Sequence, residues 1–184
     1  MFQQIISKVG HALDEAQIPY MIIGGQAVLL YGVVRLTKDI DITLGVNIDH
    51  LPKLAQIVGR LKLQIIPKNY KEFVSRTMVL PVEDPKSKIR VDFVFSYMPY
   101  EQQAIKRAKK VKLGRAIIKF ASLEDIIIHK IFSGRPKDLE DVQGIIVKHP
   151  NFDNRYIRKW LKEFSKFSET KQDYLKTFNG LKKK

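Results

Sequence analysis

Three aspartates and a pair of glycines are the residues of this sequence whose types and spacing could carry chemistry. Gly24 and Gly25 follow one short apolar run, while Asp39 and Asp41 stand two residues apart in a second one. Side chains on a strand alternate between its two faces, so these two carboxylates would share a face and repel each other. A cation between them would relieve the repulsion, and the pair therefore predicts a metal site.

Asp92 is the third acid, between Val91 and Phe93 in a run typical of a core strand. Because burying a bare carboxylate is costly, this position predicts either membership of the site or a salt-bridged or edge position. Three carboxylates on one sheet face can hold two Mg²⁺ ions about 3.5–4 Å apart. Such ions would orient a nucleoside triphosphate and lower the pKa of an attacking hydroxyl.

The glycine pair falls where a strand gives way to a helix. Backbone N–H groups at a helix N-terminus bind phosphate, and glycine lets the phosphate approach closely. A plain tight turn is the alternative interpretation of Gly24 and Gly25.

Periodicity predicts the elements that must position these residues. Helical spacing is expected over 3–17, 26–31, 51–61, 99–110, 123–133, 137–148 and 153–167. Strands are expected over 20–23, 40–44, 63–66, 73–80 and 89–95, with a strand pair around Gly114 and a loop over 81–88. The pattern predicts an α+β fold with a small mixed sheet flanked by helices. We expect residues 1–120 to form the core and residues 121–184 a helical region packed on it.

The tail from Ser168 is charged and is expected to fray, although Tyr174, Leu175 and Phe178 could dock.

Composition narrows the class of protein. Hydrophobic residues make up 45% of the 184, which is ordinary for a globular protein, and no apolar run is long enough for a membrane span. The N-terminal residues show no signal-peptide pattern, and the chain has no cysteine, which excludes disulfides and thiol chemistry. A cytoplasmic location without membrane attachment is the expectation.

The net charge of +14 points to a polyanionic partner such as RNA, DNA or a nucleotide. Lys106–Lys112 and Lys182–Lys184 are the dense basic clusters. A merely solvated basic surface is the alternative. The four histidines (His11, His50, His129 and His149) lack paired metal-ligand spacing and are interpreted as structural or surface residues.

The combination of Gly24-Gly25, Asp39-Ile40-Asp41 and Asp92 resembles the nucleotidyltransferase superfamily with the polymerase-beta-like fold. The segment Arg35 to Asp41 is most similar to the branch that contains abortive-infection-type toxin nucleotidyltransferases. That branch also has a lysine and an aspartate on a helix-break-helix, matched here by Lys130 and Asp138.

The resemblance implies roles for individual residues. Asp39 and Asp41 would bind both metal ions, and Asp92 would complete the catalytic metal site. Gly24 and Gly25 would hold the triphosphate. Five further residues would contact the phosphates or support such contacts, namely Arg35, Thr37, Lys130, Arg135 and Asp138. Snorkelling of Lys130 to solvent and a helix-dipole role for Asp138 are the structural alternatives. Many members of the superfamily have a serine directly after the first glycine, whereas this chain has Gly25 followed by Gln26. The departure removes a hydroxyl contact to phosphate.

The implied activity is Mg²⁺-dependent transfer of a nucleoside monophosphate from an NTP to a hydroxyl. A tRNA end fits the basic charge, while a protein hydroxyl or a small molecule such as an aminoglycoside stays open as acceptor. A cognate antitoxin is a further partner that the resemblance suggests. The alternative from another class is a non-catalytic module that uses the same fold to bind nucleic acid or a partner protein.

Overall fold

The computed structural model describes residues 1–168 and 172–182, and within them the chain divides into two compact units. The first unit comprises residues 1–26 and 36–121, and the second comprises residues 27–35 and 122–184. Residues 169–171, where the tail is expected to fray, and Lys183 and Lys184 of the terminal basic cluster lie outside the described residues.

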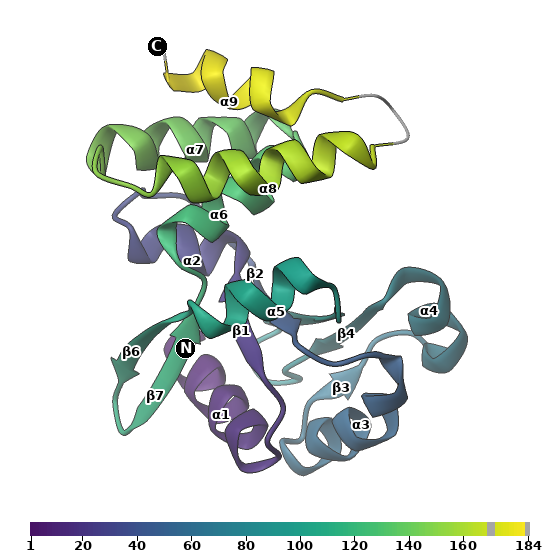
Figure 1. Ribbon diagram of the computed structural model, residues 1–184. Coiled ribbons are helices and arrows are strands. Elements are labelled where there is room, and N and C mark those ends of the chain that lie inside the picture. The colour runs from purple at the N-terminus through teal and green to yellow at the C-terminus, as the bar shows by residue number, and fades with distance from the viewer. Residues whose placement is uncertain (169–171, 183–184) are drawn as a thin grey trace. The chain divides into compact units, whose positions relative to one another are not determined.

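The first unit is built on a mixed sheet (Figure 1). In the described part of the chain the sheet has seven strands in the order β3-β4-β5-β2-β1-β7-β6. They are β1 (Tyr20–Ile23), β2 (Asp39–Leu44), β3 (Gln64–Ile65), β4 (Val79–Glu83), β5 (Arg90–Phe95), β6 (Lys109–Leu113) and β7 (Ala116–Phe120). The central strands are antiparallel between β1 and β2 and parallel between β2 and β5. This confirms the α+β class.

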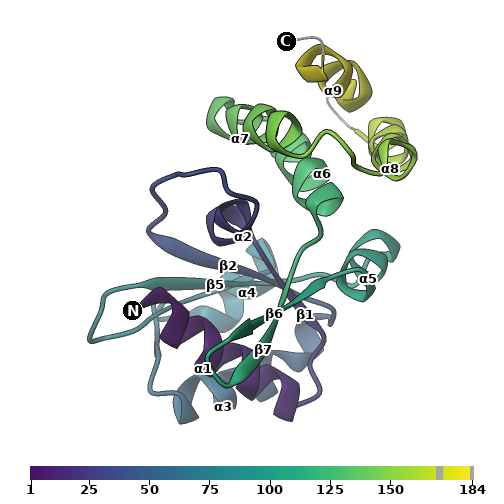
Figure 2. The same ribbon diagram turned by 90° about the vertical axis from the view of Figure 1, so that its left-hand side faces the viewer.

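Helices connect and cover these strands. They are α1 (Phe2–Glu15), α2 (Gly24–Leu30), the 3₁₀ turn η1 (Ile48–His50), α3 (Leu51–Arg60), α4 (Tyr70–Thr77) and α5 (Pro99–Lys106), of which α2 passes from the first unit into the second. α1 and α3 lie on one side of the sheet (Figure 2). The core forms because alternate strand residues are apolar: Ile40, Ile42 and Leu44 of β2 are fully buried, while Asp39 and Asp41 between them are half-buried.

The strand predicted over 73–80 is wrong for most of its length. Residues 70–77 form α4, which ends where Met78 takes a left-handed conformation with φ 59°, and the strand begins only at Val79. Phe73, Val74 and Thr77 favour strands intrinsically. Burial of Val74 alone among the residues of this helix shows that tertiary packing outweighed that preference.

The loop predicted over 81–88 is also wrong at its start, because β4 continues through Glu83. Pro81 is tolerated in the strand for a geometric reason. Its carbonyl accepts a hydrogen bond from Ile66 N–H beside β3, so its ring nitrogen points to that side too and no hydrogen bond to β5 is lost.

The second unit is helical. Its helices are α6 (Leu123–Ser133), α7 (Pro136–Lys148), α8 (Asn154–Lys166) and α9 (Tyr174–Lys182), and α6 packs against α7 and α8. Ser122 caps α6 by accepting a hydrogen bond from Asp125 N–H. Fraying of the tail is wrong for residues 174–182, which form α9; Tyr174 and Phe178 are buried there, so the alternative that these side chains dock is confirmed. No helix in the described part of the chain is both long enough and apolar enough to cross a membrane.

Candidate active site

The paired strands β2 and β5 bring the three predicted acids together. Asp41 and Asp92 are direct partners in the parallel register, and Asp39 lies two residues before Asp41. Partner residues on neighbouring strands point to the same face, and their backbones lie about 4.8 Å apart. Each of the three side chains is half-buried and open to solvent on one side.

The glycine turn closes this cluster from the β1 side. Ile23 pairs with Asp41, so Gly24 follows directly beside the acids. Gly24 has φ +63°, and a Cβ there would overlap the carboxylate of Asp41. Glycine is therefore required at position 24 for two reasons, the left-handed backbone and the lack of space.

Two further side chains organise the acids. Thr37 Oγ1 lies 3.2 Å from Asp39 Oδ1 and 3.3 Å from Asp39 O, which places it as a hydrogen-bond donor that orients this carboxylate. Arg90 Nε donates to Asp92 Oδ1 at 2.7 Å. The hydrogen bond to Asp92, opposed by desolvation and assisted by the charges of Asp92, Asp39 and Asp41, raises the pKa of Arg90.

Arg90 is the functional candidate that the sequence interpretation missed. It lies two residues before Asp92 on β5 and is the register partner of Asp39, so the alternation of strand side chains was the signal that could have found it. Its guanidinium supplies positive charge to a cluster of three carboxylates.

The donor set of the cluster fits a hard divalent cation. Mg²⁺ is bound by carboxylate oxygens and retains several waters, and Asp39, Asp41 and Asp92 offer such oxygens beside solvent. Among the described residues, no group of three or more acidic, histidine or cysteine side chains is arranged so that it could hold a metal ion, and Asp92 is turned toward Arg90. Binding of an ion would therefore reorient Asp92.

The remaining predicted residues form an ion-pair network inside the second unit. Lys130 of α6 is only 5% exposed, and its Nζ lies 2.6 Å from Asp138 Oδ1 and 2.7 Å from Asp141 Oδ2 on α7. Arg35 pairs with Asp141, and Arg135 Nε donates to Asp138 Oδ2 at 2.5 Å. Lys130 thus has two of its three donors occupied.

Hydrogen bonding fixes the charge state of this network. Desolvation disfavours the charged form of Asp138, but hydrogen bonds from Lys130, Arg135 and Ser133 outweigh it and lower the pKa to about 2. His129, the neighbour of Lys130, is half-buried, with its Nε2 atom shielded from solvent. Desolvation, and then the charge of Lys130, lower the pKa of His129 to about 4, so it is neutral at physiological pH.

Comparison with known families identifies the chain. Residues 1–177 match the family described as "Nucleotidyltransferase of unknown function (DUF6036)". The chain belongs to this nucleotidyltransferase family. No curated protein sequence is significantly similar to the chain.

Solved structures agree with this fold. The nucleotidyltransferase is similar to an antigenic nucleotidyltransferase-like protein from Paracoccidioides brasiliensis, with a TM-score of 0.56 and 19% identity over 95% of this chain and 92% of that one. It is also similar to a protein from H. pylori whose structure is described as that of a nucleotidyltransferase, with a TM-score of 0.54 and 19% identity over 95% and 80% of the two chains. A third similar structure is ANT(2")-Ia in complex with adenylyl-2"-tobramycin, with a TM-score of 0.54 and 22% identity over 79% and 87%.

Proposed function

We propose that this nucleotidyltransferase transfers a nucleoside monophosphate from an NTP to a hydroxyl of an RNA, a tRNA end being the expected acceptor. The observation that carries the proposal is the register of β2 and β5, which sets Asp41 beside Asp92 at the glycine turn. The acids lie beside the end of β1 and are only half-buried, so a triphosphate and an acceptor could both reach them.

The chain's own residues suit this reaction. Asp39, Asp41 and Asp92 would hold two Mg²⁺ ions, which when bound supply neutralisation of charge on the phosphates and a lowered pKa of the acceptor hydroxyl. Thr37 orients Asp39 for that task. Gly24 and Gly25 leave room for phosphate oxygens beside Asp41.

The proposed transfer is a single displacement. The acceptor oxygen forms a bond to the α-phosphorus of the NTP, the bond from that phosphorus to the oxygen bridging to the β-phosphate breaks, and pyrophosphate leaves. Asp92 would receive the proton of the acceptor hydroxyl. Most of the acceleration in such transfers comes from positioning and electrostatics, so few side chains suffice.

The ion-pair network contributes to phosphate binding in this proposal. Lys130 has one N–H donor beyond its two carboxylate partners, and Asp138 and Asp141 fix the direction of its ammonium group. Arg35 and Arg135 bind the same two acids and would support Lys130 in this task.

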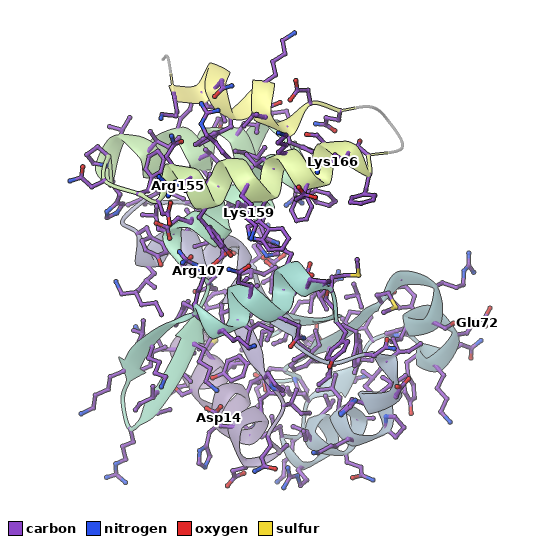
Figure 3. All side chains as sticks on the ribbon, in the orientation of Figure 1. Asp14, Glu72, Arg107, Arg155, Lys159 and Lys166 are labelled. Carbon is purple, nitrogen blue, oxygen red and sulfur yellow. The ribbon has the colours of Figure 1, made fainter. Side chains whose placement is uncertain are left out.

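A labelling assay tests the proposal. Wild-type protein is incubated with each α-labelled NTP, Mg²⁺ and total tRNA, and compared with Asp41→Asn and with Glu72→Gln, which removes an acid of α4 (labelled in Figure 3). We expect RNA labelling by the wild type and by Glu72→Gln but not by Asp41→Asn. Equal labelling by all three proteins, or none by any, would contradict the proposal.

A toxin-like role in the cytoplasm, with an antitoxin that restrains it, belongs to the same proposal. The motif from Arg35 to Asp41 supports it. Induced expression of the wild type is then expected to arrest growth of a bacterial host, while Asp41→Asn is harmless at the same protein level. Arrest by both proteins would refute an enzymatic toxin.

A further inference from the structure

The end of α5 and the β6–β7 hairpin of the first unit carry a concentration of positive charge that the proposed chemistry does not use. Between Glu101 and Glu124 the chain has no acidic residue and seven basic ones, namely Lys106, Arg107, Lys109, Lys110, Lys112, Arg115 and Lys119. All of them except Lys119 are exposed. Lys119 is paired with Asp14 of α1.

Four of these side chains have no counter-ion within the described residues. They are Lys106, Lys110, Lys112 and Arg115. A surface that gathers several uncompensated cations attracts a polyanion, and release of the polyanion's counterions strengthens binding.

The strand order shows where the basic residues lie relative to the acids. β6 is the edge strand, and its first residue, Lys109, pairs with Phe120 at the end of β7. Phe120 in turn pairs with Ile22, two residues before Gly24. The basic strand therefore begins at the edge of the sheet where the acids and the glycine turn lie, about 14 Å from β2 by three strand spacings.

From that edge the hairpin leads away from the acids. Its five paired residues reach about 16 Å to the turn at Gly114, where Arg115 lies (Figure 1). Figure 3 shows Arg107 where α5 ends and this strand begins. A linear arrangement of cations fits an extended chain of phosphates better than a single small anion.

A purely protective role explains the charge less well. Edge strands often carry lysine to prevent pairing with other chains, but a charge of either sign serves that purpose. Here seven charges have the same sign. A membrane surface is also disfavoured, because the exposed large apolar side chain on the hairpin is Ile117 and the hairpin presents no exposed tryptophan or tyrosine to anchor at an interface.

We propose that Lys106–Lys112 and Arg115 form a track that binds the phosphate backbone of an RNA acceptor and directs its end to the acids. This inference rests on the proposed function for its choice of RNA. The track offers cations but no exposed aromatic ring, so it contacts phosphates rather than stacking bases, and binding depends little on sequence.

A charge-matched pair of triple variants tests the track. The test variant is Lys110→Gln/Lys112→Gln/Arg115→Gln. The control, Lys68→Gln/Lys71→Gln/Arg76→Gln, removes the same charge around α4, which connects β3 to β4 at the opposite end of the sheet. Binding of a fluorescent tRNA transcript is measured by anisotropy from 50 to 200 mM salt without NTP, and thermal unfolding confirms that both variants fold.

We expect the test variant to bind at least about tenfold more weakly at low salt, with a slope of log affinity against log salt that is smaller by about 2, while the control stays near the wild type. Equal losses in both variants, or no RNA binding by the wild type at low salt, would overturn the track. Wild-type binding to anionic vesicles without binding to RNA would overturn it as well.

The binding assay separates the track from the reaction. Asp41→Asn is expected to bind RNA as tightly as the wild type although it transfers nothing. If no transfer is found with any NTP but the test variant still loses RNA binding, the track stands and the proposed function fails. If transfer occurs to a small-molecule hydroxyl and RNA does not bind, the reverse holds.

Discussion

Each of the two units contains a cluster of aspartates, but the clusters differ in the number of basic side chains that accompany them. The first unit has Asp39, Asp41 and Asp92, and the second has Asp138 and Asp141. The first cluster gathers three acids around the guanidinium of Arg90. In the second, three cations, Lys130, Arg35 and Arg135, serve two acids.

The difference in charge balance suggests different roles: the first cluster suits ligand binding, and the second mainly stabilises the fold. The first cluster is partly open to solvent and has an excess of negative charge, which suits the divalent ions that the proposed function requires. In the second, Lys130, Asp138 and Asp141 are buried and paired with one another, which holds α6 and α7 together and fixes the direction of Lys130. Substitutions of the acids in the first should therefore change activity and metal binding without loss of stability, whereas substitutions of the acids in the second should lower stability, and should change phosphate binding only through Lys130.

The largest effect is expected for the open cluster. Asp41→Asn should lower the rate of nucleotidyl transfer at least about a thousandfold, or by about 4 kcal/mol in transition-state stabilisation, because it removes a carboxylate oxygen that both ions would share in the proposed site. The melting temperature should stay near that of the wild type, since the substitution relieves repulsion between acids. Label transfer and thermal unfolding measure the two effects. A loss of activity that merely follows unfolding would break the comparison.

The buried network should respond in the opposite way. Asp138→Asn leaves Lys130 and Arg135 short of a partner, and we expect it to destabilise the chain by about 3 kcal/mol in urea unfolding. Glu140→Gln is the matched control, because Glu140 is an exposed acid of the same helix. A change of less than about 0.5 kcal/mol in Asp138→Asn would show that the network does not stabilise the fold.

The pH dependence of the free energy of unfolding tests the structural role of the second cluster further, through His129, the neighbour of Lys130. Its folded pKa of about 4 lies below the ordinary histidine value of 6.5, so between these values the unfolded chain binds a proton that the folded chain does not. The contribution of His129 to the free energy of unfolding is therefore fully present above pH 6.5. It falls by up to about 3 kcal/mol as the pH drops to 4.

His129→Leu should flatten this part of the pH profile in urea unfolding. His50→Gln, at an exposed histidine, should leave the profile unchanged. A profile with the same slope in His129→Leu and in the wild type would refute the assignment of this titration to His129.

Arg90 should give the smallest effect, and one of opposite sign. Because its guanidinium competes with a metal ion for Asp92, Arg90→Gln is expected to tighten Mn²⁺ binding by about fivefold, or about 1 kcal/mol. Arg76→Gln on α4 controls for the loss of one positive charge. Weaker Mn²⁺ binding in Arg90→Gln would show that Arg90 supports the metal site instead of competing with the ion.

Local signals predicted most of the elements. Strand β1 and helix α6 fall where apolar periodicity and capping residues put them, and the strand alternation predicted that Asp39 and Asp41 share a face. The strand pair around Gly114 is confirmed as β6 and β7, although it begins two residues earlier than expected. These features depend on neighbours in the sequence, which is why a single chain reveals them.

Features set by long-range contacts escaped prediction. Helix α4 was mistaken for a strand because its residues favour strands in isolation. The partners of Lys130 lie on another helix, and Arg35 reaches Asp141 across 106 positions of sequence. Likewise, residues 27–35 group with the helical second unit, a division that follows from packing rather than from composition.

Titration with Mn²⁺, in the absence of RNA, tests the central claim most directly. Calorimetry on the wild type, on Asp39→Asn and Asp41→Asn, and on the control Glu72→Gln measures the ion at the acids without requiring turnover. We predict saturable binding by the wild type and the control, and at least a tenfold loss of affinity in each aspartate variant, with all four proteins folded. Equal Mn²⁺ affinity in all four would contradict the assignment of Asp39, Asp41 and Asp92 as the metal site.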